Sequence, residues 1–170
     1  MATKLAVRND KESHHSANEI HGSEAVSKTL TQGVTDLLDL RMQVKQAHWN
    51  IAGSSFFGVH KLLDKLAEEL DATIDTTAER QRSLGFITHG TARHVAKNSS
   101  LKQLAAETQA IPEVVNHLVD LYLTVGEATK EGIRLADEEE DPGTSDMLVD
   151  CLRMLDQHRY LLQSYLMQSE

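Results

Sequence analysis

Apolar residues recur every three or four positions along four long stretches of the chain, which is the spacing of one face of an α-helix. Ser23 precedes the first stretch as an N-cap residue type, and this predicts a helix over about residues 24–50. After a Gly-Ser-Ser turn a second helix runs to about residue 83, where Gly85 provides a stop. The inward positions of these two helices are Val26, Leu30, Val34, Leu37, Leu38, Val44, Leu63, Leu66, Leu70, Ile74 and Thr77.

The second half of the chain resumes the helical spacing after a long connection. Residues 85–109 are enough to cross the length of a bundle, and we expect a short helix within them near residues 100–107. Pro112 suits the start of a third helix, and a fourth begins around residues 142–144. Four helices with one long crossover between the second and third describe an all-α, ferritin-like four-helix bundle. The inward positions here are Ile111, Val114, Val115, Leu118, Leu121, Tyr122, Val125, Leu148, Cys151, Leu152, Leu155, Leu162, Tyr165 and Leu166.

Composition supports a single helical domain and also indicates the cellular compartment of the protein. Residues 1–22 lack periodicity and are expected to form a flexible tail, so the bundle domain spans residues 23–170. Aromatic residues make up only 4% of the chain, which favours aliphatic helix packing over a sheet. The single cysteine, Cys151, excludes a disulfide framework and is expected in the core. There is no signal peptide and no apolar run long enough for a membrane span, so we expect a cytoplasmic protein without a membrane partner.

Four polar residues on the second predicted helix form two pairs. His60 and Asp64 are four positions apart, as are Asp75 and Glu79, and each pair therefore shares one helix face. Eleven residues, about three turns, separate Asp64 from Asp75, so both pairs lie on one stripe opposite the apolar one. Acidic residues at this spacing also commonly face solvent, and the spacing alone leaves that interpretation open.

The distance between the two pairs decides how they could share a metal. Eleven residues place Asp64 and Asp75 roughly 16 Å apart along the helix, whereas metal–ligand bonds are about 2 Å long. One ion can meet both pairs only if a second copy of the helix runs antiparallel beside the first. A twofold axis would do this and would create two equal sites. The spacing therefore suggests a metal site shared between subunits.

His48, near the end of the first helix, extends this set of candidate ligands. Two histidines and three carboxylates, with no thiolate nearby, suit an intermediate divalent ion such as Fe(II), Mn(II) or Zn(II). None of the four helices contains the Glu-x-x-His motif that an ordinary ferritin site inside one bundle needs. His89, His94, His117 and His158 are scattered one to a segment, and no ligand role is predicted for them.

Three motifs in this region resemble the ferroxidase signature of Dps, the DNA-binding protein from starved cells, a miniferritin: KQAHWN at 45–50, VHxxLD at 59–64 and DTTAERxRxLG at 75–85. The resemblance covers about residues 24–168. It implies iron ligands His48, His60 and Asp64 from one subunit, with Asp75 and Glu79 from its twofold mate. It places Trp49 beside the iron, where it takes up oxidising equivalents.

The resemblance also implies a function and an assembly. Fe(II) would be oxidised preferentially with hydrogen peroxide, and the Fe(III) mineralised inside a hollow homododecamer, which protects DNA from oxidative damage. Acidic residues where the third helix meets the fourth line threefold pores in the family, and Asp141 and Asp146 are the candidates here. Zn(II) or Mn(II) are alternative occupants of the same site.

Two other functions stay open at this stage. A DNA-binding, nucleoid-compacting protein with a secondary iron site is one, but the tail's Lys4, Arg8 and Lys11 are balanced by three acidic residues, and the formal net charge of the chain is −9. Protonation of His14, His15 and His21 would make the tail positive only below about pH 6.5. A separate possibility is that these histidines hold an accessory metal, as the Glu12-x-x-His15 spacing allows. A mononuclear non-haem iron enzyme using His48, His60 and Asp64 is the other, and it leaves Asp75 and Glu79 unused.

Overall fold

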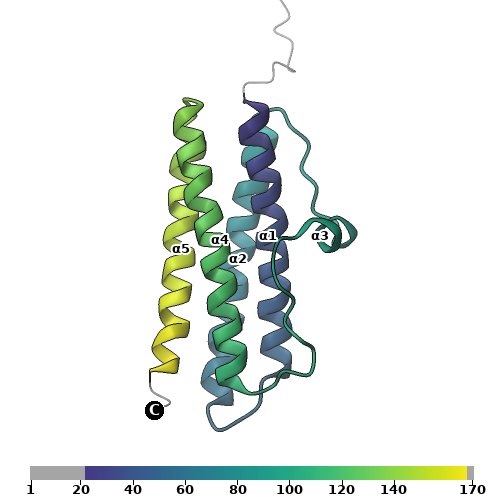
Figure 1. Cartoon of the computed structure of the whole chain (residues 1–170), viewed down its shortest axis with the longest axis vertical. Helices are drawn as coiled ribbons and strands as arrows, with labels where there is room; N and C mark the ends of the chain where they lie inside the picture. Colours follow the sequence, from purple (N-terminus) through teal and green to yellow (C-terminus); the bar gives the residue numbers. More distant parts are fainter. Residues whose placement is uncertain (1–21, 168–170) are drawn as a thin grey trace, which may run out of the picture.

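The computed structural model describes residues 22–167, and its regular elements are all helical apart from one isolated bridge between Ala52 and Ala110. The four long helices lie side by side, and a short one stands outside the bundle next to α1 (Figure 1). In chain order they are α1 (Glu24–Asn50), α2 (Phe56–Ser83), α3 (Ala92–Asn98), α4 (Ile111–Glu138) and α5 (Pro142–Leu166). The predicted all-α bundle with a helix in the second-to-third crossover is confirmed.

The ends of the long helices follow from local sequence signals. The Ser23 hydroxyl accepts a hydrogen bond from the Val26 amide at 3.1 Å and so caps α1. Gly85 ends α2 with φ 92°, a left-handed conformation that favours glycine. Pro112 lies in the first turn of α4, where its missing N–H costs nothing. The tail residues singled out in the sequence lie outside the described part of the chain.

The position predicted for the short helix is wrong. It was expected near residues 100–107, but α3 ends at Asn98 and the following residues are irregular. The reason is a long-range contact with α1: the Ser100 amide and hydroxyl donate to the Asp36 carboxylate, and the Ser99 hydroxyl donates to Asp39. These side-chain bonds hold the backbone of Ser99 extended, at φ −61° and ψ 139°, and so stop the helix there.

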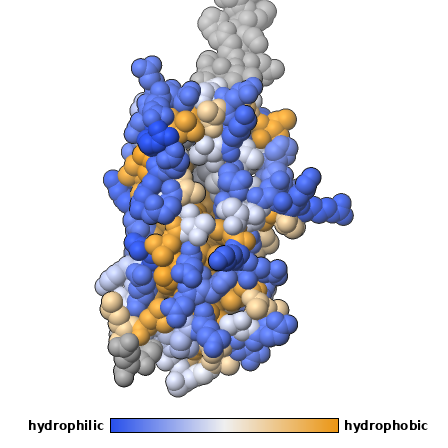
Figure 2. All heavy atoms as spheres, viewed as in Figure 1, coloured by the Kyte–Doolittle hydropathy of each residue, from blue (hydrophilic) through white to orange (hydrophobic). Residues whose placement is uncertain are grey.

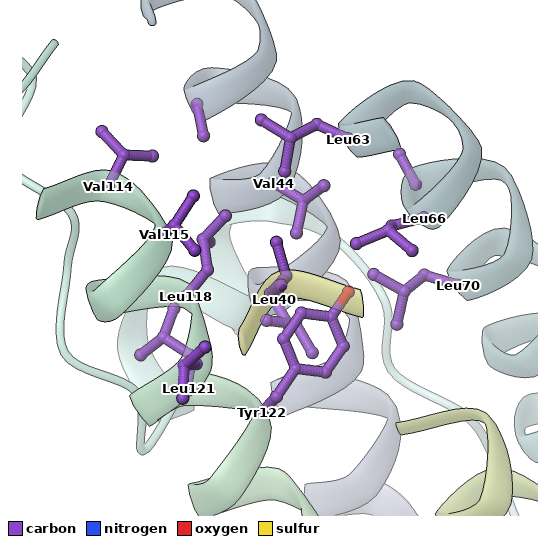
Figure 3. Packing of buried hydrophobic residues seen from close by; sticks show 14 of the residues in the cluster. Leu40, Val44, Leu63, Leu66, Leu70, Val114, Val115, Leu118, Leu121 and Tyr122 are labelled. Atoms are coloured by element: carbon purple, nitrogen blue, oxygen red, sulfur yellow. The ribbon is translucent and has the colours of Figure 1, made fainter. Parts of the chain in front are cut away.

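The core lies between two helical hairpins, α1 with α2 and α4 with α5. Figure 3 shows aliphatic side chains from α1, α2 and α4 meeting around the ring of Tyr122, which extends from α4 into the cluster. Cys151 is buried in this core, as expected. Leu38 and Leu152, predicted to point inward, are only half-buried. The fully enclosed members from the three helices include Leu40, Val44, Leu63, Leu66, Leu70, Val114, Val115 and Leu118.

Polar side chains cover most of the face seen in Figure 2, and apolar ones show mainly in the seams between helices. This is the pattern of amphipathic helices packed around one core. Among the described helices, none combines the length and the apolar character needed to cross a membrane.

Candidate metal centre

His48 and His60 lie face to face where α1 ends and α2 begins. Their rings stack with centroids 3.7 Å apart and planes inclined by 20°. The Nδ1 atom of His48 is 2.9 Å from the backbone oxygen of His60, and the Nδ1 atom of His60 is 2.9 Å from the backbone oxygen of His48. The two residues therefore hold each other in place by a reciprocal pair of hydrogen bonds.

These contacts fix the chemical form of both rings. A carbonyl oxygen can only accept, so each Nδ1 must carry a hydrogen and donate it. In the neutral ring the lone pair is then left on Nε2, which is the form of histidine that binds metals. His48 is buried to 8% exposure and His60 is half-buried, so neither ring turns freely. The structure thus presents two Nε2 atoms ready to coordinate an ion.

Asp64 lies one turn beyond His60 and carries its carboxylate to the same end of the bundle. Its Oδ1 atom is 3.9 Å from His48 Nε2 and 2.8 Å from Lys45 Nζ. The hydrogen bond from Lys45 is the main reason why the pKa of Asp64 lies below its ordinary value. Lys45 was not singled out in the sequence; its position three residues before His48 was the only available signal. A cation that binds Asp64 must compete with this ammonium group.

Asp75 and Glu79 lie about three turns further along α2. Both are exposed, and neither makes a hydrogen bond or ion pair with another described residue. Their carboxylates are therefore free to bind a cation or a second molecule. This differs from Asp64, whose carboxylate already has a partner.

Within the described residues, no three His, Cys, Asp or Glu side chains come close enough together to hold a metal ion. The structure brings His48, His60 and Asp64 to one end of α2 but leaves Asp75 and Glu79 at a distance. Two histidines and an aspartate that do not converge form at most part of a binding site. A complete set from these five residues requires ligands from a second copy of the chain.

The two aspartates predicted to line a pore lie near the start of α5. Asp141 is the N-cap of that helix: its carboxylate accepts from the Thr144 amide at 3.0 Å and pairs with Arg80 at 2.6 Å. Burial opposes ionisation of Asp141, but the bonds from Thr144 and the charge of Arg80 outweigh it and lower the pKa. Asp146 is exposed one turn later. Asp141 thus has a local structural role, and the pore role of both stays a prediction.

Comparison with known proteins decides the family. The sequence profile described as the ferritin-like domain matches residues 27–170. The DNA protection during starvation protein of Agrobacterium fabrum is 30% identical over 154 residues, covering 89% of this chain and 95% of that protein. This chain belongs to the Dps family.

Other relatives match this chain along nearly their whole length. General stress protein 20U of Bacillus subtilis is 28% identical, covering 85% of this chain and 99% of that protein. The crystal structure of a Dps protein from Bacillus brevis superposes with a TM-score of 0.80 at 28% identity, covering 84% of this chain and 95% of that one. Dps from Listeria innocua, soaked with zinc, gives a TM-score of 0.79 at 26% identity, covering 83% and 95%. The ferritin-like Dps fold expected from the sequence is confirmed.

Proposed function

We propose that this Dps chain is the subunit of an iron-storing ferroxidase. Fe(II) is its substrate, hydrogen peroxide its preferred oxidant, and Fe(III) mineral its stored product, held inside a hollow dodecamer. The observation that supports this most is that His48 and His60 each keep Nε2 free to bind a metal, with His48 Nε2 3.9 Å from the Asp64 carboxylate. This half of a binding site is complemented by the two free carboxylates of Asp75 and Glu79 from a twofold-related subunit.

The ligand chemistry suits iron in both oxidation states. Neutral imidazole nitrogens and carboxylate oxygens bind intermediate divalent ions, including Fe(II), Zn(II) and Mn(II). Three carboxylates add negative charge, and negative ligands favour Fe(III) over Fe(II) because they stabilise the higher charge. Because the Lys45 ammonium already pairs with Asp64, an incoming ion must displace it, and this offsets one unit of the ion's positive charge.

The surface around the histidines supports a subunit interface. Trp49 is 69% exposed and Phe57 is 72% exposed, and both lie at the turn between α1 and α2. Apolar side chains gathered at one place on a surface are typical of a protein contact. A second copy that covers them would bring its own α2 to the same ions. Trp49 then lies beside the iron, where it serves as a sink for stray oxidising equivalents.

Peroxide takes two electrons to become water, and two Fe(II) supply them without releasing hydroxyl radical. Removing both iron and peroxide in this way protects DNA from oxidative damage. The overall negative charge of the chain attracts Fe(II), and Asp141 and Asp146 are our candidates for its entry path. The competing mononuclear enzyme has less support, because its three ligands do not converge within the described part of one chain.

The test is anaerobic loading with Fe(II), followed by hydrogen peroxide, with ferric absorbance and peroxide consumption recorded. Wild type is compared with His48→Ala and Asp75→Ala, and with Asp120→Ala, which removes an exposed carboxylate from α4. We expect fast oxidation near two Fe(II) per peroxide in wild type and Asp120→Ala, and loss of it in the other two. Oxidation no faster than that of free iron in buffer would overturn the proposal. Activity retained in Asp75→Ala alone would favour the mononuclear enzyme.

A further inference from the structure

Three side chains from three helices form a hydrogen-bonded chain in the core, away from the metal centre. The Tyr122 hydroxyl of α4 is 3.0 Å from His158 Nδ1 of α5, and His158 Nε2 is 2.6 Å from Glu69 Oε2 of α2. Tyr122 is 1% exposed and His158 is 0% exposed, whereas Glu69 reaches the surface. Figure 3 shows the Tyr122 ring within the aliphatic cluster.

The direction of each hydrogen bond follows from its acceptor. An ionised carboxylate only accepts, so His158 Nε2 donates to Glu69. Nδ1 of the neutral ring then accepts from the Tyr122 hydroxyl. Burial lowers the pKa of His158 in spite of Glu69, which agrees with a neutral ring at rest. The hydroxyl of Tyr122 therefore points at a base, and that base is backed by a carboxylate.

This arrangement suits the loss of one electron from Tyr122. A phenol gives up an electron far more easily when its proton can move at the same moment to a hydrogen-bonded base. The imidazolium that forms on His158 is stabilised by the Glu69 carboxylate, and the surrounding leucines and valines keep solvent from the oxidised ring. Tyr160, by contrast, is 66% exposed and has no such shelter.

One end of the relay, Glu69, lies on the same helix as four of the five proposed iron ligands. Glu69 follows Asp64 by five residues and precedes Asp75 by six, which is about 7.5 Å and 9 Å of rise along α2. Along the helix it therefore lies between the two ligand pairs. An electron can pass over such a span through packed side chains, without any path for solvent.

We propose that Tyr122 is a redox residue that supplies the missing electron when peroxide meets a site holding a single Fe(II), with His158 accepting the phenolic proton. The proposal takes its oxidant from the proposed function. One Fe(II), Tyr122, hydrogen peroxide and two protons from solvent give Fe(III), a Tyr122 phenoxyl radical, protonated His158 and two waters. The O–O bond breaks, Fe(II) and Tyr122 each lose one electron, and the O–H proton of Tyr122 moves to His158 Nδ1.

The next Fe(II) to arrive restores the resting state. It gives one electron to the phenoxyl radical, and the proton returns from His158 to the Tyr122 oxygen. The sum over both steps is two Fe(II) per peroxide, even when iron is delivered one ion at a time. Tyr122 would thus keep the oxidation free of released hydroxyl radical when iron is scarce.

The test uses the assembled protein, loaded anaerobically with one Fe(II) per site, mixed with hydrogen peroxide and freeze-quenched for electron paramagnetic resonance. Wild type is compared with Tyr122→Phe and with the controls Tyr160→Phe and Tyr165→Phe, which together cover the three tyrosines of the chain. A spin trap records released hydroxyl radical in parallel. His158→Gln keeps hydrogen-bonding groups at this position but cannot take the proton.

We expect a tyrosyl signal in wild type and both controls, its loss in Tyr122→Phe, and several-fold more trapped hydroxyl radical in that variant. In His158→Gln the signal should be weaker, with altered g-values, because the phenoxyl oxygen no longer accepts a bond from an imidazolium. A signal unchanged in Tyr122→Phe would overturn the proposal. The absence of any tyrosyl signal in wild type while peroxide is consumed would also overturn the proposal. Tyr122, His158 and Glu69 would then have only a structural role, as hydrogen bonds between helices.

Failure of the proposed function would be recognised by a different result, namely iron oxidation that is no faster than in buffer. In that case a ruthenium tris-bipyridyl photo-oxidant with persulfate replaces iron and peroxide, and is applied to metal-free protein. A radical that depends on Tyr122 and changes in His158→Gln would support the relay. A radical confined to the exposed Trp49 and Tyr160 would overturn it.

Discussion

His48 and His60 each donate the Nδ1 hydrogen to the other's backbone carbonyl, so one pair of contacts both closes the α1–α2 turn and sets the tautomer of two ligands. The fold and the site therefore share the same hydrogen bonds. A substitution at either histidine changes two things at once, and suitable variants are needed to separate them.

His48→Asn separates the structural and chemical roles of His48. The Asn amide nitrogen can occupy the place of Nδ1 and keep the bond to the His60 carbonyl, but it offers no lone pair where Nε2 was. We expect stability close to that of wild type and a large loss of iron oxidation. His48→Ala should lose the same activity and, in addition, about 1 kcal/mol of stability. Urea unfolding beside the oxidation assay checks this, and equal destabilisation in both variants would argue against the structural role.

Lys45→Met should strengthen binding of divalent ions. The Lys45 ammonium lies 2.8 Å from Asp64 Oδ1 and competes with an incoming cation. Its removal should raise Zn(II) affinity about two- to five-fold, the range expected for one partly exposed charge. Calorimetric titration of the assembled protein measures this, with Lys28→Met, an exposed lysine nearer the start of α1, as the control. Weaker binding in Lys45→Met would show that Lys45 supports the site instead.

Tyr122→Phe should destabilise the bundle even if no redox chemistry takes place. The variant leaves His158 Nδ1 buried without a donor, which costs about 1–3 kcal/mol, whereas Tyr160→Phe on the surface should cost almost nothing. Equilibrium unfolding of both variants provides the comparison. Equal stability of the two would mean that the Tyr122–His158 bond contributes nothing net to folding.

His158 makes stability depend on pH in a calculable direction. Burial lowers its pKa from the ordinary 6.5, so the unfolded chain binds a proton more readily than the folded one. The stability linked to this group is present above pH 6.5 and is lost as the pH falls below it. Replacing His158 by Gln should flatten that part of the stability profile. A slope that remains unchanged between about pH 7 and pH 5 would assign the effect to other groups.

Asp141 should contribute to the stability of the fold in two separate ways, as the N-cap of α5 and as the charged partner of Arg80. Asp141→Asn keeps an N-cap side chain for Thr144 but loses the pairing with Arg80, while Asp141→Ala loses both, at about 1 kcal/mol for the cap. The pKa of Asp141 is lowered from 3.8, so its ionic contribution is present above pH 3.8 and is lost as the pH falls below that value. Unfolding near neutral pH and near pH 3 measures both, and identical losses in the two variants would contradict the division.

The sequence predicted the features that depend on local spacing. The four helices, the Ser23 cap and the offset of the two ligand pairs follow from periods and residue types that need no partner elsewhere in the chain. The features it did not predict all depend on contacts between distant segments. The bond from Ser100 to Asp36 explains why the short helix is not where the sequence predicted it. The reciprocal bonds of His48 and His60 form only after the turn between α1 and α2 has brought the two residues together.

The Tyr122–His158–Glu69 chain is the extreme case of this limit. Its members lie 36 and 89 residues apart in sequence and come from three helices. Periodicity indicates whether each of these side chains is buried or half-buried, but it does not indicate which residue the side chain will contact. His158 belongs to no recognisable sequence motif. It gains its two hydrogen-bond partners only when α5 packs against α2 and α4.

The central claim is that the metal site takes ligands from two subunits, and mixed assembly tests it most directly. His48→Ala and Asp75→Ala subunits are unfolded together, refolded as a mixture and assayed for peroxide-driven iron oxidation beside each variant alone. In a mixed dimer one of the two sites combines the mutated halves, and the other combines an intact His48 with an intact Asp75 of the partner subunit. Random pairing should therefore restore about a quarter of the wild-type activity, although each variant alone is inactive. No recovery in assemblies shown to contain both subunits would contradict a shared site.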